Sequence, residues 1–269
     1  MSAVETSRET VGLTVDDHGV AIVTLNRPER RNGLSAGLCN ALYASLLEIA
    51  ETPAKVLILR GVGRDFCVGA DLSEAAASET GGAPPARISK AYAIPALLHT
   101  MPQVTIASID GGCAGAGLGW ASACDMRFAA TRARFATAFI KVGASGDMGL
   151  AWSLMRLVGS ARARELLYFS DKFDAAQALD WGLVTRVFDE SALLEATLDA
   201  ARLLAGLPAE ALRAMKANIL SAEGLAFHPY VEVETARHLH LASGPALQEG
   251  FAAFRAIKSP DATPPASAD

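Results

Sequence analysis

Apolar runs alternate with short polar or glycine-containing turns through the first half of the chain. Four of these runs have the length of buried strands: Val11–Val15, Val20–Leu25, Val56–Arg60 and Val104–Ile109. Between the second and third runs, apolar positions recur at helical spacing from Leu38 to Ile49, and Ser35 stands where a helix N-cap is expected. The pattern therefore predicts an α/β fold in which strands, turns and helices follow one another.

The second half of the chain becomes helical. We expect helices from Leu150 onward, with Asp174 capping a helix that ends near Trp181. A short strand is expected over Val184–Phe188, and everything after Glu190 is expected to be helical.

Length and composition favour one large domain with an appendage. A chain of 269 residues, 51% of them hydrophobic, builds a sizeable core. We expect a core domain over residues 1–205 and a C-terminal helical region over residues 206–269, with residues 259–269 disordered. The net charge is −5 and no basic patch is present, so we expect no nucleic-acid partner.

The cysteines and the N-terminus indicate a cytoplasmic protein. None of the four cysteines has metal-ligand spacing, so we expect reduced thiols packed as small hydrophobic side chains: Cys39, Cys67, Cys113 and Cys124. The N-terminus shows no basic-then-apolar signal sequence. The uncharged run Ala91–Ile109 is interrupted by Pro95 and Pro102, so we predict that it does not span a membrane.

A glycine-rich turn follows the strand Val104–Ile109 and leads into a helix of small residues. It reads Ile109-Asp110-Gly111-Gly112-Cys113-Ala114-Gly115-Ala116-Gly117-Leu118-Gly119. Such a turn directs backbone N–H groups at a bound anion, or at an oxygen that becomes negative during a reaction. The glycine spacing matches no dinucleotide fingerprint and the turn has no Gly-Lys-Ser/Thr, which argues against a phosphate loop. Close packing of a helix on a sheet is the structural alternative.

Two further motifs place this turn in context. Gly61-Val62-Gly63-Arg64-Asp65-Phe66-Cys67-Val68-Gly69-Ala70-Asp71-Leu72 follows the third strand, and Leu25-Asn26-Arg27-Pro28-Glu29-Arg30-Arg31-Asn32-Gly33-Leu34-Ser35 precedes the first helix. In this order and spacing the three motifs resemble the crotonase superfamily, also called the enoyl-CoA hydratase/isomerase family. The resemblance extends from about Val11 to about Pro260. It implies a spiral of repeated ββα units whose C-terminal helical region joins subunits into homotrimers or dimers of trimers.

The same resemblance implies an acyl-CoA thioester as substrate, with no metal and no cofactor beyond the coenzyme A of the substrate. The backbone N–H groups of Val68 and Ala116 correspond to the family's oxyanion hole, where each donor stabilises an enolate oxygen by about 3 kcal/mol. Substrate contacts are expected at Arg27, Arg30, Arg31, Gly69, Ala70, Asp71, Leu72, Gly115 and Gly117, and at Lys258 toward a neighbouring subunit. Tyr92, Phe139 and Trp152 are expected to line the acyl pocket, beside a mobile flap over Ser73–Lys90.

Two positions depart from the hydratase pattern. Hydratases of this family use two glutamates to position and activate water, and this chain has Gly119 and Phe139 there. Asp147 resembles the catalytic aspartate of several isomerases and of 4-chlorobenzoyl-CoA dehalogenases. Its apolar, glycine-rich surroundings favour a raised pKa suited to proton transfer. A helix N-cap for a helix starting near Met148 is the structural alternative for Asp147.

These residues favour isomerisation of a double bond or ring through an enolate, with Asp147 as the acid/base group. Enoyl-CoA hydration is the first alternative, hydrolytic dehalogenation of an aryl-CoA the second, and a catalytically inactive acyl-CoA-binding subunit the third. Asp71 is expected to fix its turn, and the histidines of the C-terminal region are expected at a surface or interface.

Overall fold

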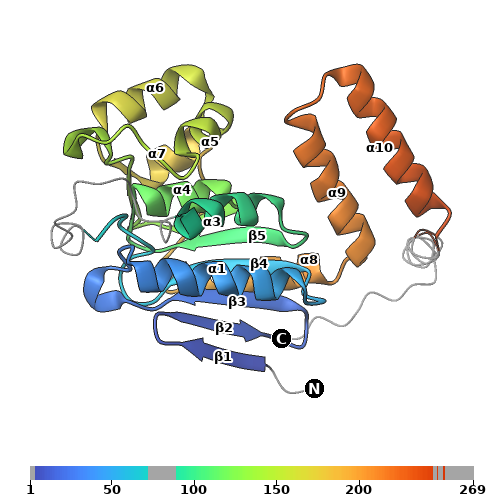
Figure 1. Ribbon diagram of the computed structural model, residues 1–269, viewed down its shortest axis with the longest axis horizontal. Coiled ribbons are helices and arrows are strands. Elements are labelled where there is room, and N and C mark those ends of the chain that lie inside the picture. Colours follow the sequence, from blue (N-terminus) through green and yellow to red (C-terminus); the bar gives the residue numbers. More distant parts are fainter. Residues whose placement is uncertain (1–3, 72–88, 245–246, 248–250, 252–269) are drawn as a thin grey trace. The chain divides into compact units, whose positions relative to one another are not determined.

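The computed structural model describes residues 4–71, 89–244, 247 and 251 (Figure 1). The chain divides into two compact units, Met1–Gly206 and Leu207–Asp269, next to the predicted boundary after residue 205. Leu72, Lys258, the predicted disordered end over residues 259–269 and most of the predicted flap lie outside the described residues. Among the described helices, none is long and apolar enough to cross a membrane.

A seven-stranded sheet forms the centre of the first unit, in the order β1-β2-β3-β4-β5-β7-β10. The bounds of its strands are β1 Val4–Arg8, β2 Val11–Val15, β3 Val20–Leu25, β4 Val56–Gly61, β5 Val104–Ile109, β7 Met126–Ala130 and β10 Arg186–Phe188. β1, β2 and β3 pair antiparallel, and every later neighbour pairs parallel. The prediction missed β1, because its sequence VETSR has no apolar alternation and its pairing with β2 defines it.

Helices cover both faces of this sheet, as period-two alternation requires (Figure 1). Leu57 and Leu59 point into the core that contains α1 (Ala36–Ala50) and α3 (Ser89–Thr100). Val56 and Ile58 of the same strand pack against α8 (Leu193–Ala205) on the opposite face.

Local capping signals were predicted correctly. The Ser35 side chain accepts a hydrogen bond from Leu38 N at 3.1 Å and opens α1. Asp174 forms a capping box with Gln177 and opens α7 (Ala175–Asp180).

A second, three-stranded sheet lies beside the glycine-rich turns. It is formed by β6 (Gly112–Ala114), β8 (Arg134–Ala136) and β9 (Phe173–Asp174), in the order β6-β8-β9. The helices that follow the parallel strands in this half are α4 (Ala116–Ala123), α5 (Leu150–Leu157) and α6 (Gly159–Phe169). Two short 3₁₀ turns, η1 (Pro28–Arg30) and η3 (Ile140–Val142), complete the first unit.

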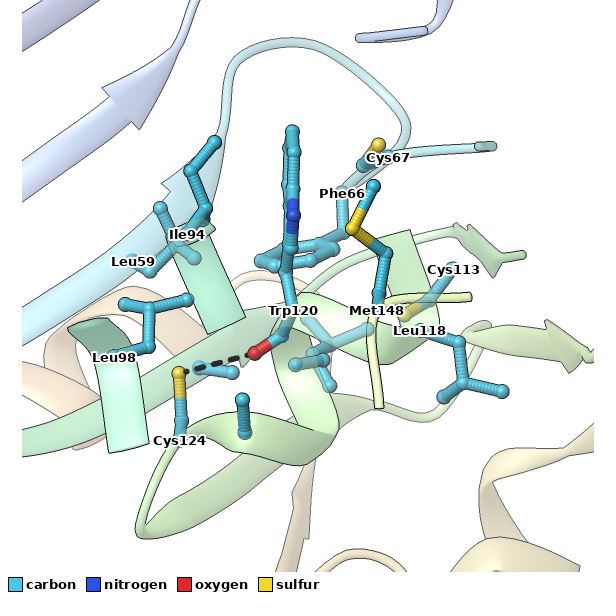
Figure 2. Packing of buried hydrophobic residues seen from close by; sticks show 14 of the residues in the cluster. Leu59, Phe66, Cys67, Ile94, Leu98, Cys113, Leu118, Trp120, Cys124 and Met148 are labelled. Atoms are coloured by element: carbon cyan, nitrogen blue, oxygen red, sulfur yellow. Dashed lines mark hydrogen bonds between the residues drawn. The ribbon is translucent and has the colours of Figure 1, made fainter. Parts of the chain in front are cut away.

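Trp120 of α4 is fully buried at the centre of the main core (Figure 2). Figure 2 also shows Phe66, Ile94 and Met148 in the same cluster, so the core joins three segments that are distant in sequence. The end of α4 is held by the buried guanidinium of Arg127, which donates to Cys124 O at 2.6 Å and, toward a more distant segment, to Leu183 O at 2.6 Å. This buried cation satisfies carbonyl groups that a helix end leaves unpaired.

The second unit contains the helices α9 (Ala209–Ala222) and α10 (Phe227–Ala242). Arg237 of α10 donates to Asn218 Oδ1 of α9 at 2.9 Å. Of the side chains described in these two helices, Lys216 alone is buried. Several large apolar side chains are therefore exposed on this unit: Met215, Ile219, Phe227, Val231 and Leu239.

Candidate active site

The three motifs found in the sequence meet at the carboxyl ends of the parallel strands. Cys67 N donates to Gly112 O at 3.1 Å, and Ala114 N donates to Cys67 O at 3.0 Å, so the second and third motifs form a β-bridge. Leu34 N donates to Gly69 O at 2.8 Å and ties the first motif to the second. The glycine-rich turns are thus neighbours in space.

Asp65 holds two of these motifs together. Its carboxylate accepts hydrogen bonds from Gly112 N at 2.7 Å and from Arg31 Nε at 2.7 Å, and its side chain is 3% exposed. Burial by itself raises the pKa of Asp65, but the hydrogen bonds from Arg31 and Gly112 and the charge of Arg31 outweigh it, so the pKa lies below its usual value.

Asn32 is a second polar connector, and it is fully buried. Its Nδ2 donates to Val62 O at 3.0 Å and to Asp65 O at 2.8 Å, while its Oδ1 accepts from Arg27 N at 2.8 Å. Neither Asn32 nor Asp65 was predicted from the sequence to be a site residue. A polar residue inside a glycine-bearing motif was the available signal, but only the fold shows its burial and partners.

Val68 and Ala116 follow directly from the bridged segments. Within the described residues, neither backbone N–H donates a hydrogen bond, and Ala116 is the first residue of α4. Gly117 permits this approach, because a Cβ at that position would overlap the carbonyl oxygen of Cys67. Gly69 and Gly115 also lie against each other: a Cβ on Gly69 would come within 3.5 Å of Gly115 Cα. Both candidate oxyanion donors therefore project from one tightly packed pair of turns.

Three of the charged residues expected to contact coenzyme A form ion pairs in the structure. Arg27 donates to Gly33 O at 2.7 Å and to Asp71 Oδ2 at 3.3 Å, and its side chain is 12% exposed. This ion pair joins the second motif, which contains Asp71, to the first motif, which contains Arg27. That Asp71 fixes its own turn stays a prediction. Arg31 pairs with Asp65 yet keeps 56% of its side chain exposed, and Arg30 is exposed on η1.

The two positions that carry glutamates in hydratases are filled differently here. The Phe139 ring lies between Gly115 and Gly146, 3.9 and 3.8 Å from the Cβ positions of these glycines. At Gly119, a Cβ would overlap the Cβ of Met148. Apolar side chains therefore occupy the space beside both positions.

Asp147 lies in the loop between η3 and α5, and its Oδ1 is buried without a hydrogen-bond partner among the described residues. Burial raises the pKa of its carboxyl group. The N-cap alternative is wrong, because Gly149 is the N-cap of α5 and no side chain caps that helix. An orphaned carboxylate oxygen beside an apolar loop is the environment expected for a proton-transferring group.

The loop borders a small aromatic pocket of about 270 Å³. Tyr92 and His99 of α3 and Trp152 of α5 line it, together with Met148 and Gly149. His99 meets Trp152 edge to face, with ring centroids 5.3 Å apart. The structure thus brings two of the three predicted acyl-pocket residues together, while Phe139 does not line this pocket and its ring lies near Gly115 and Gly146.

A larger cleft of about 740 Å³ borders the side chain of Val68 but includes neither Phe139 nor Asp147. Its lining is strongly cationic: Arg31, Arg64, Arg132, Arg134 and Lys172. The distribution of charge and of aromatic side chains therefore separates this cleft from the apolar pocket beside Asp147.

Metal and thiol chemistry find no support among the described residues. No group of three histidine, cysteine, aspartate or glutamate side chains in this part of the chain is close enough to hold a metal. All four cysteines are buried and form no disulfide, as predicted, and burial raises the pKa of the Cys67 thiol to about 12.

Comparison with known proteins identifies relatives over almost the whole chain. The family model described as enoyl-CoA hydratase/isomerase matches residues 16–261. The chain is 34% identical over 251 residues to 1,2-epoxyphenylacetyl-CoA isomerase of Escherichia coli K12, which covers 92% of this chain and 96% of the relative. It is 36% identical over 208 residues to the probable enoyl-CoA hydratase EchA14 of Mycobacterium tuberculosis, covering 77% and 80% of the two chains. The crystal structure of an enoyl-CoA hydratase from Bacillus anthracis superposes with a TM-score of 0.85 at 28% identity, covering 95% of this chain and 96% of that one.

Proposed function

Because the chain belongs to the enoyl-CoA hydratase/isomerase family, we propose that it isomerises an acyl-CoA thioester, with Asp147 transferring the proton. In this proposal the backbone N–H groups of Val68 and Ala116 donate hydrogen bonds to the thioester carbonyl oxygen. Removal of a proton from the carbon beside the thioester places negative charge on that oxygen, where two aimed N–H groups stabilise it. Return of the proton at another carbon moves the double bond or opens a ring without net addition of atoms.

The buried, unpartnered Oδ1 of Asp147 carries this proposal. An ionised carboxylate without hydrogen-bond donors is a stronger base than an exposed one, since burial disfavours its charged form. Apolar side chains pack beside Gly119 and Phe139, and among the described residues near them Asp147 has a carboxylate oxygen without a hydrogen-bond partner.

The aromatic pocket supports an acyl group that contains a ring. Tyr92, His99 and Trp152 offer flat or edge-on contacts to such a group, and the Escherichia coli relative is named for a phenylacetyl thioester. We assign the acyl group to this pocket and leave the cationic cleft outside the acyl site.

Hydration is the second candidate, favoured by the relative from Mycobacterium tuberculosis. It requires a group that positions water, and neither Gly119 nor Phe139 offers one. A dehalogenase would use Asp147 as a nucleophile and would require a separate base, and a binding subunit would keep the turns without turnover.

The test is a turnover screen of enoyl-, dienoyl- and aryl-CoA thioesters in heavy-oxygen water, read by mass spectrometry. Isomerisation leaves the product mass unchanged, whereas hydration adds one labelled oxygen. With the substrate so identified, Asp147→Asn keeps the size of the side chain but cannot accept a proton. We expect turnover to fall about 10²- to 10⁴-fold, the usual contribution of a general base.

The exposed Asp171, 82% exposed beside Lys141, provides the matched control Asp171→Asn, which should keep its turnover. Labelled product in the first experiment, or unchanged turnover of Asp147→Asn in the second, contradicts the proposal.

A further inference from the structure

Met148, the residue after Asp147, has an unusual backbone. Its φ is +54°, in the left-handed region that glycine adopts easily and a residue with a Cβ adopts at a cost. Its side chain is nevertheless 6% exposed and belongs to the main core, where Figure 2 shows it in the cluster that contains Trp120 and Phe66. Burial of the thioether therefore offsets an unfavourable backbone conformation at this position.

Gly119 is what makes room for this arrangement. A Cβ on Gly119 would overlap the Cβ of Met148 and would come within 3.3 Å of the Met148 carbonyl oxygen. The backbone of α4 and the loop before α5 are thus in direct contact, and the methyl group of an alanine at residue 119 would push them apart.

The rest of the loop has few other anchors. Leu150 N donates to Asp147 O at 3.1 Å, and Gly149 follows with a φ of +69°. The Asp147 side chain makes no hydrogen bond to the described residues, so its position depends on the backbone on either side.

We propose that the contact between Gly119 and Met148 positions the carboxylate of Asp147, and that it excludes any side chain at residue 119. Gly119 and Met148 are then positioning residues, and the inference rests on the proposed role of Asp147. A carboxylate side chain at residue 119 would need the space that Met148 occupies. The chain can therefore hold a carboxylate at residue 119 or Asp147 in its observed position, but not both, and this choice affects which reaction the site favours.

Three variants test this contact: Gly119→Ala, Met148→Gly and the double variant. In Gly119→Ala the added methyl group displaces Met148, and we expect kcat to fall about 10²-fold with little change in KM, as a displacement of about 1 Å can cause. In the Met148→Gly background the same alanine has no Cβ to meet, so we expect it to lower kcat less than about twofold. This double-mutant cycle isolates the contact from independent effects of each substitution.

Gly37→Ala in α1 is the matched control. The nearest atom to its added Cβ is Ser35 Oγ at 3.8 Å, an ordinary contact, so its kcat should equal that of the wild type. An equal penalty for Gly119→Ala in both backgrounds overturns the proposal.

A second readout is independent of turnover. The carboxyl carbon of Asp147, followed by NMR during a pH titration, reports its burial. In Met148→Gly, which suits a left-handed backbone and should fold, we expect the loop to loosen and the pKa to move down toward its usual value. An unchanged titration in both Met148→Gly and Gly119→Ala refutes the positioning role. A shifted titration with unchanged turnover would leave the positioning role standing and refute the catalytic role of Asp147 instead.

Discussion

At residue 147, burial acts against the charge of the carboxylate. The unpartnered Oδ1 gains no hydrogen bond when it is desolvated, and burial raises the pKa of Asp147. A carboxyl group whose pKa is higher in the folded than in the unfolded chain favours folding while it is protonated. That contribution to stability is complete when the pH lies below the pKa of the group in the unfolded chain, about 3.9, and it is lost as the pH rises through the pKa of the group in the folded protein.

Asp147→Asn should therefore not destabilise the protein at neutral pH. We expect its Tm at pH 7.5 to equal or exceed that of the wild type, and the difference to shrink as the pH approaches 4. Differential scanning calorimetry between pH 4 and pH 7.5 measures this difference in Tm, with Asp171→Asn as control. A variant that is less stable at pH 7.5 would show that Asp147 has a structural role. A gain in stability together with lost turnover would mark a functional site that is not optimised for stability.

At the scale of elements, buried polar side chains reinforce the backbone bridges that align the glycine turns. Asp65 accepts from both Arg31 and Gly112 N, whereas the pair between Arg132 and Asp110 has similar geometry but is 47% and 26% exposed. Buried, charge-assisted hydrogen bonds contribute more than exposed ones because water does not compete for them.

Asp65→Asn should lower the free energy of unfolding at pH 7 by about 1–3 kcal/mol, and the matched Asp110→Asn by less than about 1 kcal/mol. The pKa of Asp65 lies below its usual value in the folded protein. The stability that the ionised Asp65 contributes is therefore present at pH values above its pKa in the unfolded chain, and it is lost as the pH falls through its pKa in the folded protein. Urea unfolding at pH 7 and pH 3.5 checks both statements. The difference in the free energy of unfolding between the wild type and Asp65→Asn should be smaller at pH 3.5 than at pH 7. Equal losses in the two variants at pH 7 would be incompatible with this account.

At the scale of the whole molecule, the described part of the second unit leaves large apolar side chains exposed. Met215 and Ile219 lie one turn apart on α9 and are 60% and 54% exposed. We propose that a second copy of this chain covers them, in keeping with the homotrimer or dimer of trimers that the family resemblance implies.

Light scattering during size-exclusion chromatography of the full-length protein tests self-association. We expect the wild type to elute as a trimer or hexamer and Met215→Asp/Ile219→Asp as a monomer, because two buried carboxylates oppose association. Arg213→Asp, at an exposed polar position of the same helix, should leave the oligomer intact. A monomeric wild type, or a double variant that still assembles, would refute the proposed interface.

The sequence by itself determined four strands of the central sheet and α1, in their order, but not β1 or α3. Apolar periodicity predicted the parallel strands and α1, and Ser35 and Asp174 predicted helix starts, because capping and periodicity depend on residues a few positions apart. The glycine motifs pointed to the turns, and the family resemblance that they carry pointed to Asp147 as a candidate.

Only the tertiary structure decided how these parts meet. Nothing near Asp65 in the sequence shows that it bonds Gly112, and nothing near Gly119 shows that Met148 fills its space. The N-cap role of Asp147 was likewise excluded by the observed start of α5. Burial, orphaned oxygens and the pKa shifts that follow from them depend on contacts between distant segments, so they arise only when the chain has folded.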